Sequence, residues 1–298
     1  MASFINNLRD NLKQSSTLQK LLIINIVVFL LINILKALMQ LFMLSMNDYV
    51  DITDWLAVPA SFPLLITRPW TLITYMFLHE EFFHILFNML WLYWMGQIFQ
   101  EYLGNKKLVS TYILGGISGA LLYIIAFNLF PLFSTAVLSA YALGASASVL
   151  AITVAAATLL PEYPVNLLFF GRIPLKFIAI VTILLDLVSV SGNNAGGHIA
   201  HLGGALFGFI YIRQLRKGTD IAVWFITLMD KIAFLFKSSS RPTMKVKYKR
   251  AVDDDAYLQT KKARQEYVDE ILDKISKSGY GSLTKEEKDF LFTSSKEN

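Results

Sequence analysis

Histidine and serine are the residues of this 298-residue chain whose types and spacing could support chemistry. The chain has no cysteine, which excludes a cysteine nucleophile, and its four histidines form two close pairs, His79 with His84 and His198 with His201. A serine hydroxyl becomes an effective nucleophile when a neighbouring imidazole takes its proton. Ser146 lies in the sequence GASAS, whose small residues allow a substrate or another backbone to come close. We therefore expect acyl-transfer chemistry at Ser146, supported by a histidine.

The second histidine pair precedes a run of small residues. His201 begins the sequence HLGGALFG, so a bare helical face lies beside its imidazole and another helix can approach it closely. The natural partner is the helix of Ser146, which also has a face of small residues. That packing would bring the serine hydroxyl against the imidazole. The residues expected to give this clearance are Gly144, Ala147, Gly204 and Gly208.

Hydrolysis by a serine also needs hydrogen-bond donors aimed at the oxyanion that forms on the substrate. His84 and Asn88 are four residues apart in HILFN, so both project from one face of a helix. The Asn88 amide, the His84 ring N–H and the backbone N–H groups of Ala145 and Ser146 are the expected donors.

Six apolar runs must position these residues. Each has about 18 to 25 residues, enough to cross a hydrocarbon core of ~30 Å, and the composition is 55% hydrophobic and 16% charged. A segment of about 40 residues after the first run contains Trp55 and Trp70 and is predicted to be a partly embedded loop. The predicted runs are 21–43, 82–102, 108–130, 139–160, 173–190 and 197–215.

Basic residues predict the orientation of the bundle, because Lys and Arg near span ends stay on the cytoplasmic side. Clusters at 9–20, 106–107, 172–176 and 213–217 all fall on one side of a six-span bundle. Both ends of the chain are therefore expected in the cytoplasm. His84, Asn88, Ser146 and His201 then lie roughly 3 to 10 Å below the outer ends of their runs, in one layer.

The charge distribution separates the bundle from a tail, since residues 237–298 hold 14 of the 27 Lys and Arg. We expect a cytoplasmic segment at 1–20, a catalytic bundle at 21–217, an interfacial helix with a polybasic linker at 218–250, and a small soluble helical tail at 251–298. Residues 219–236 could instead form a seventh span, but Asp230 and Lys231 interrupt the run. The tail is either a docking module or a solvated appendage.

At these residues the sequence resembles the rhomboid family of intramembrane serine proteases, over roughly residues 15–217. HILFN with Trp91 resembles the family's His-x-x-x-Asn motif. GASA resembles its Gly-x-Ser-Gly motif, and AHLGGALFG resembles its Ala-His-x-x-Gly-x-x-x-Gly motif. The three motifs occur in order and on the expected runs.

The resemblance implies an all-α, six-span rhomboid-like bundle with a long first loop and a small cytoplasmic tail. Ser146 would be the nucleophile and His201 its base, with His84, Asn88, Ala145 and Ser146 lining the oxyanion hole. The substrates would be transmembrane segments of other proteins in the lipid bilayer, cut near their extracytoplasmic ends. No cofactor, metal ion or nucleic acid is expected. A bacterial inner membrane is the expected location.

Three residues depart from the family pattern. Ala147 stands where the family usually has glycine. Leu150 stands where many members have an aromatic ring beneath the histidine, so other contacts must position His201. Thr71 follows Trp70 where the family has arginine, and Arg68 is a candidate substitute.

Several alternatives stay open at the level of sequence. Asp186 could orient His201, although we favour a group that faces the aqueous cavity or caps a loop. His198 could hold water or meet the lipid headgroups, and His79 is expected to organise its own loop. A non-catalytic relative that binds transmembrane helices is the main competing function. A metalloprotease is disfavoured, because the five-residue spacing of His79 and His84 turns the two apart on a helix.

Overall fold

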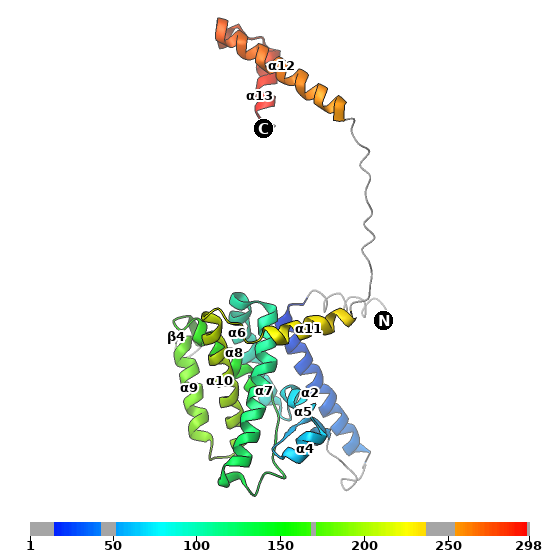
Figure 1. The fold of residues 1–298 in the computed structure, drawn as a ribbon, viewed down its shortest axis with the longest axis vertical. Helices are drawn as coiled ribbons and strands as arrows, with labels where there is room; N and C mark the ends of the chain where they lie inside the picture. The colour runs from blue at the N-terminus through cyan, green and yellow to red at the C-terminus, as the bar shows by residue number, and fades with distance from the viewer. Residues whose placement is uncertain (1–14, 43–51, 168–170, 237–253, 297–298) are drawn as a thin grey trace. The chain divides into compact units, whose positions relative to one another are not determined.

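The computed structural model describes residues 15–42, 52–167, 171–236 and 254–296. The chain forms two compact units, Met1–Lys237 and Ser238–Asn298. The first unit is a helical bundle (Figure 1). Its main helices are α2 (Thr17–Leu41), α6 (Phe82–Leu103), α7 (Asn105–Leu129), α8 (Ser146–Leu159), α9 (Leu175–Ser189), α10 (Ala195–Arg216) and α11 (Val223–Phe236).

Helices occupy all six of the predicted apolar runs. Among the described residues, α2, α6, α7 and α10 are long and apolar enough to cross a membrane. The 14 residues of α8 and the 15 of α9 extend only about 21 and 22 Å, less than a hydrocarbon core of ~30 Å. Four membrane-spanning candidates are therefore seen, and the count of six stays a prediction.

The structure corrects the expected start of the fourth run. The run was expected to be helical from 139, but α8 begins at Ser146. The chain before it turns at Gly144, whose φ of 122° suits glycine, and forms strand β2 (Tyr141–Ala142), antiparallel to β1 (Val58–Pro59). A second antiparallel pair, β3 (Pro164–Leu167) with β4 (Gly171–Pro174), joins α8 to α9. The fold is thus mainly helical, and the two short strand pairs are a detail that the sequence did not predict.

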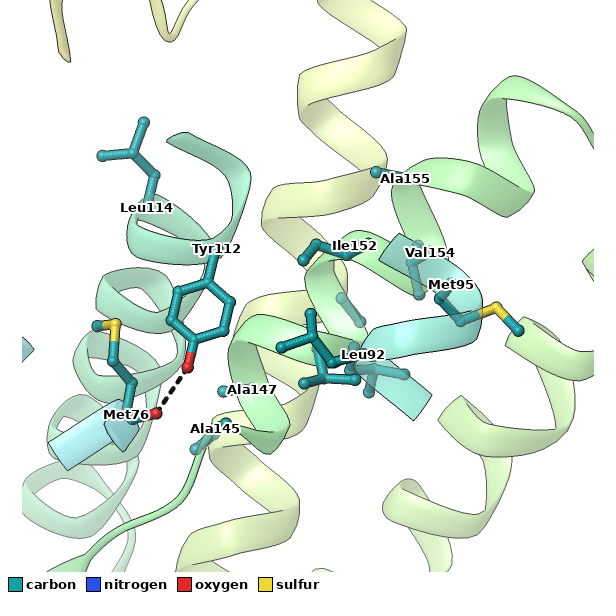
Figure 2. Packing of buried hydrophobic residues seen from close by; sticks show 14 of the residues in the cluster. Met76, Leu92, Met95, Tyr112, Leu114, Ala145, Ala147, Ile152, Val154 and Ala155 are labelled. Atoms are coloured by element: carbon teal, nitrogen blue, oxygen red, sulfur yellow. Dashed lines mark hydrogen bonds between the residues drawn. The ribbon is translucent and has the colours of Figure 1, made fainter. Parts of the chain in front are cut away.

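The long first loop is folded and partly buried. It contains α3 (Ile52–Leu56), α4 (Phe62–Thr67), α5 (Thr71–Thr74) and the 3-10 turn η1 (Tyr75–Phe77). Met76 is fully buried, and its carbonyl accepts a hydrogen bond of 2.9 Å from the Tyr112 hydroxyl of α7 (Figure 2). The Asn128 amide of α7 donates to the Ala60 carbonyl at 2.8 Å. These bonds fix the loop against α7.

Helix α8 lies at the centre of the bundle, and eleven of its fourteen residues are buried. A helix that is apolar all round is suited to such a place. Helix α10 packs directly on its backbone. A Cβ at Gly204 would lie 2.0 Å from the Ala147 carbonyl oxygen, and one at Gly208 would lie 2.2 Å from that of Ala151. The two glycines therefore permit the close approach expected from the sequence.

Helix α11 runs across the end of the bundle in Figure 1. The Lys106 ammonium contacts the Asp230 carboxylate at 2.7 Å and so ties α11 to the start of α7. Its 14 residues extend about 21 Å, too short for a seventh span. The polybasic linker at 237–250 and most of the N-terminal segment, 1–14, lie outside the described residues.

The second unit is a helical hairpin of α12 (Asp254–Ser278), the turn η3 (Tyr280–Ser282) and α13 (Lys285–Lys296). The Tyr267 and Phe290 rings meet edge to face with centroids 4.9 Å apart. Thr284 and Glu287 exchange hydrogen bonds of 2.7 and 3.3 Å between backbone N–H groups and side chains. This capping box begins the second helix.

Candidate active site

A cavity of about 490 Å³ opens between α6, α8, α9 and α10, and four of the predicted site residues line it. His84 and Asn88 come from α6, Ser146 from α8 and His201 from α10. Asp186 of α9 completes the polar lining, together with Glu81 and Thr182. Helices distant in the sequence therefore bring a serine, two histidines and an amide to one cavity.

Ser146 is the first residue of α8, a position that favours oxyanion chemistry. The first N–H groups of a helix have no partner within it, and the helix dipole places partial positive charge there. The cap residue is Ala145, which has no side-chain acceptor for these N–H groups. The usual bond of a helical serine to the carbonyl four residues earlier is not formed, because Ala142 lies in β2.

The imidazole of His201 is held through its Nδ1 by Asp186 of α9. Its Nδ1 lies 2.9 Å from Oδ1 of Asp186, and Nδ1 of His198 lies 2.8 Å from the same oxygen. Ser146 and His201 line the same cavity but are not hydrogen-bonded to each other in this structure. Such contacts commonly tighten when substrate binds.

His84 lies against the turn that precedes the serine. A Cβ at Gly144 would be 2.9 Å from Nε2 of His84 and 3.7 Å from Oγ of Ser146, so only glycine leaves room for the ring. The Asn88 amide donates to the His84 carbonyl at 2.9 Å. An amide nitrogen carries two hydrogens, so Asn88 keeps a second donor.

Comparison with known proteins agrees with this architecture. The family model of the rhomboid domain matches residues 67–218 of the sequence, about half of the chain. The chain belongs to the rhomboid family. A second model, for a family of unknown function (DUF6576), matches residues 253–297, which include the helical hairpin.

Two curated relatives show how far the rhomboid similarity extends. RHOMBOID-like protein 12, mitochondrial, from Arabidopsis thaliana is 32% identical over 160 residues, which are 51% of this chain and 48% of that protein. Rhomboid protease GlpG of Salmonella newport is 35% identical over 63 residues, 21% of this chain and 22% of the relative. The matched stretches therefore span less than half of either relative.

One expected oxyanion donor of this rhomboid chain is already engaged. The backbone N–H of Ala145 donates to Nε2 of His79 at 3.4 Å. His79 is 2% exposed, and its burial together with the neighbouring His84 lowers its pKa to about 4. His79 therefore contacts the turn that precedes Ser146, a role that its place in the first loop did not suggest.

Asp186 and His198 are the polar residues whose arrangement sequence reasoning missed. The sequence placed Asp186 near the depth of His201 but favoured a side chain that faces the aqueous cavity or caps a loop. His198 was expected to hold water or to meet the lipid headgroups. Their shared hydrogen bonds depend on how α9 packs on α10. The polar atoms of Asp186, His198 and His201 also lie within 4.8 Å of one another, a spacing that a divalent cation could bridge.

The departures from the family pattern have structural consequences here. Leu150 lines the cavity and offers the His201 ring neither an aromatic face nor a hydrogen bond. Arg68 donates to the Asp54 carbonyl at 2.8 Å, and its guanidinium lies 4.4 Å from the centroid of Trp55. Trp70 stacks on Trp55 with centroids 6.1 Å apart. Arg68 therefore organises the aromatic part of the first loop.

Proposed function

We propose that this rhomboid chain is an intramembrane serine endopeptidase that uses Ser146 as nucleophile and His201 as general base. The observation that carries the proposal is the meeting of Ser146, His201, His84 and Asn88 in one cavity. Rhomboid membership and the similarity to Rhomboid protease GlpG support the reaction class.

The reaction proceeds in two steps at the Ser146 hydroxyl. Nε2 of His201 takes the hydroxyl proton while Oγ attacks the peptide carbonyl carbon, and the imidazolium then protonates the leaving amine. Water next attacks the acyl-enzyme with His201 again as base, which releases the new carboxylate and restores the serine.

The oxyanion of each tetrahedral intermediate is stabilised by donors around the start of α8. The Ser146 N–H, the free hydrogen of the Asn88 amide and a ring N–H of His84 are the proposed donors. The Ala145 N–H can contribute only when its bond to His79 is released.

The proposed substrates are transmembrane segments of other membrane proteins, cut near their extracytoplasmic ends. The cavity is lined by apolar side chains of α6 and α9, including Phe83, Phe87 and Leu185, which suit an apolar chain entering from the lipid. The basic residues at the opposite ends of the helices support cytoplasmic termini. One relative is mitochondrial and another bacterial, so the bacterial inner membrane stays a prediction from the sequence.

The test is cleavage of reporter proteins with one transmembrane segment by the full chain in liposomes. We expect the wild type to cut, and Ser146→Ala and His201→Ala to lose cleavage. Ser148→Ala is the matched control, because Ser148 is buried on the same helix and does not line the cavity. Reporter binding without cleavage by the wild type would favour the non-catalytic, helix-binding relative instead.

A further inference from the structure

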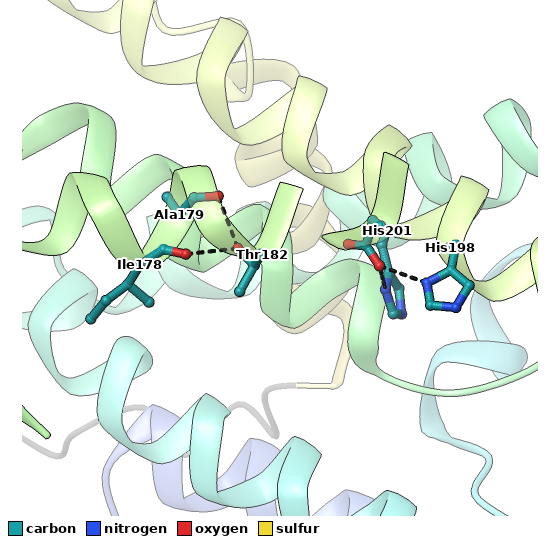
Figure 3. Close-up of polar contacts among 6 residues, drawn as sticks. Ile178, Ala179, Thr182, His198 and His201 are labelled. Carbon is teal, nitrogen blue, oxygen red and sulfur yellow. Dashed lines mark hydrogen bonds and ion pairs between the residues drawn. The ribbon is translucent and has the colours of Figure 1, made fainter. Parts of the chain in front are cut away.

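A single carboxylate oxygen joins the two histidines of α10. Oδ1 of Asp186 lies 2.9 Å from Nδ1 of His201 and 2.8 Å from Nδ1 of His198 (Figure 3). The histidines are three residues apart, so they project from the same side of α10 toward α9. Asp186 is 7% exposed. A buried carboxylate needs such donors, because burying an unpaired charge is costly.

The arrangement fixes which nitrogen of His201 carries the proton. An ionised carboxylate only accepts hydrogen bonds, so a neutral imidazole facing it carries hydrogen on Nδ1. Nε2 of His201 then keeps its lone pair, which a general base for Ser146 requires. Among the described residues, Asp186 is the only hydrogen-bond partner of the His201 imidazole.

We propose that Asp186 is a positioning residue that holds His201 with hydrogen on Nδ1 and Nε2 available to Ser146, with His198 as the second donor that keeps the carboxylate in place. This inference rests on the proposed serine endopeptidase. It assigns a role to α9 that Ser146 and His201 alone do not give. The orientation of the His201 ring then depends on α9 remaining packed against α10.

Kinetics of Asp186→Asn in the full chain test the proposal. The amide has the shape of the carboxylate but lacks its charge. We expect kcat for the reporter to fall by about 10²–10⁴-fold, as when a catalytic histidine loses its orienting carboxylate, with KM within about threefold of wild type. Asp186→Glu should recover at least about tenfold of the loss. His198→Gln should cost about tenfold or less, because the Asp186–His201 contact survives.

Asp230→Asn is the matched control. It removes a carboxylate from α11 that pairs with Lys106 at the surface and is not part of the cavity. We expect wild-type kcat and KM. A wild-type kcat in Asp186→Asn, or the same loss in Asp230→Asn, would overturn the role of Asp186.

Nitrogen NMR of histidine-labelled protein separates this inference from the proposed function. With four histidines in the chain, His201→Ala and His198→Ala assign the signals. We expect His201 to carry hydrogen on Nδ1 in the wild type and to lose that preference in Asp186→Asn, whether or not any reporter is cut. Hydrogen on Nε2 of His201 in the wild type would overturn the inference. Binding of one equivalent of zinc by the wild type that is lost in Asp186→Asn would also overturn it, because the three side chains would then form a metal site. A wild type that shows the expected signal but cuts nothing would refute the protease and leave the positioning intact.

Discussion

The backbone N–H of Ala145 donates a hydrogen bond to Nε2 of His79 across 3.4 Å. The neighbouring Gly144 N–H donates to the Tyr75 carbonyl at 2.9 Å. Two consecutive N–H groups before Ser146 are therefore bound by the loop that precedes α6. The position of Ser146 depends on this loop as well as on α8.

The buried His79 predicts a loss of stability in acid. Its pKa in the folded chain is about 4, below the ordinary value of about 6.5 in the unfolded chain. The unfolded state therefore binds the proton first, so stability is full above about pH 6.5 and falls as the pH drops toward 4. Between pH 7.5 and pH 5 the loss should be about 2 kcal/mol.

Unfolding of the wild type and of His79→Gln in detergent at these two pH values measures this effect. Glutamine retains an acceptor for the Ala145 N–H but does not titrate. The free energy of unfolding of His79→Gln should fall less than that of the wild type on acidification. Equal losses in both proteins would contradict the buried, neutral histidine.

The contact between α8 and α10 predicts that Gly204→Ala is destabilising. The new Cβ would lie 2.0 Å from the Ala147 carbonyl oxygen, which is backbone and cannot move alone. The two helices must separate, and such overpacking costs about 1–3 kcal/mol. Thermal unfolding should show a lower Tm, and reporter cleavage should fall because Ser146 and His201 move apart.

Gly281→Ala serves as the control for this substitution. Its Cβ would meet nothing within 4 Å, so the Tm should stay at the wild-type value. An unchanged Tm and unchanged cleavage in Gly204→Ala would show that the backbones of α8 and α10 are not in direct contact.

The absence of cysteine makes the proposed orientation easy to test. Leu138→Cys labels the exposed connection between α7 and α8, and Lys217→Cys labels the exposed end of α10. A membrane-impermeant maleimide should modify Leu138→Cys in intact cells, and Lys217→Cys only after the membrane is opened. The reverse pattern would invert the topology and place the candidate site toward the cytoplasm.

The sequence predicted those features that depend on local pattern. Apolar run length located the helices, since α6 and α10 begin within two residues of the predicted starts. The glycines after His201 predicted the close packing on α8, because residues at spacings of three and four lie on one helical face. The motif residues His84, Asn88, Ser146 and His201 are brought together in the cavity as their common depth suggested.

The features that sequence reasoning missed depend on tertiary contacts or on backbone turns. An apolar count cannot separate strand from helix at Tyr141–Ala142, so the start of α8 was placed too early. The His79–Ala145 contact joins residues 66 positions apart. The Asp186–His201 contact depends on the connection between α9 and α10, whose αL residue Asn194 ends the loop. No periodicity within one helix encodes these pairings.

The most direct measurement of the central claim is the site and rate of covalent labelling by a fluorophosphonate, which reacts with an activated serine. Mass spectrometry of the wild-type full chain should find one adduct, on Ser146. Ser146→Ala should carry none, His201→Ala should label far more slowly, and Ser148→Ala should label like the wild type. An adduct on another residue, or a labelling rate unchanged by His201→Ala, would contradict the assignment of Ser146 as a nucleophile activated by His201.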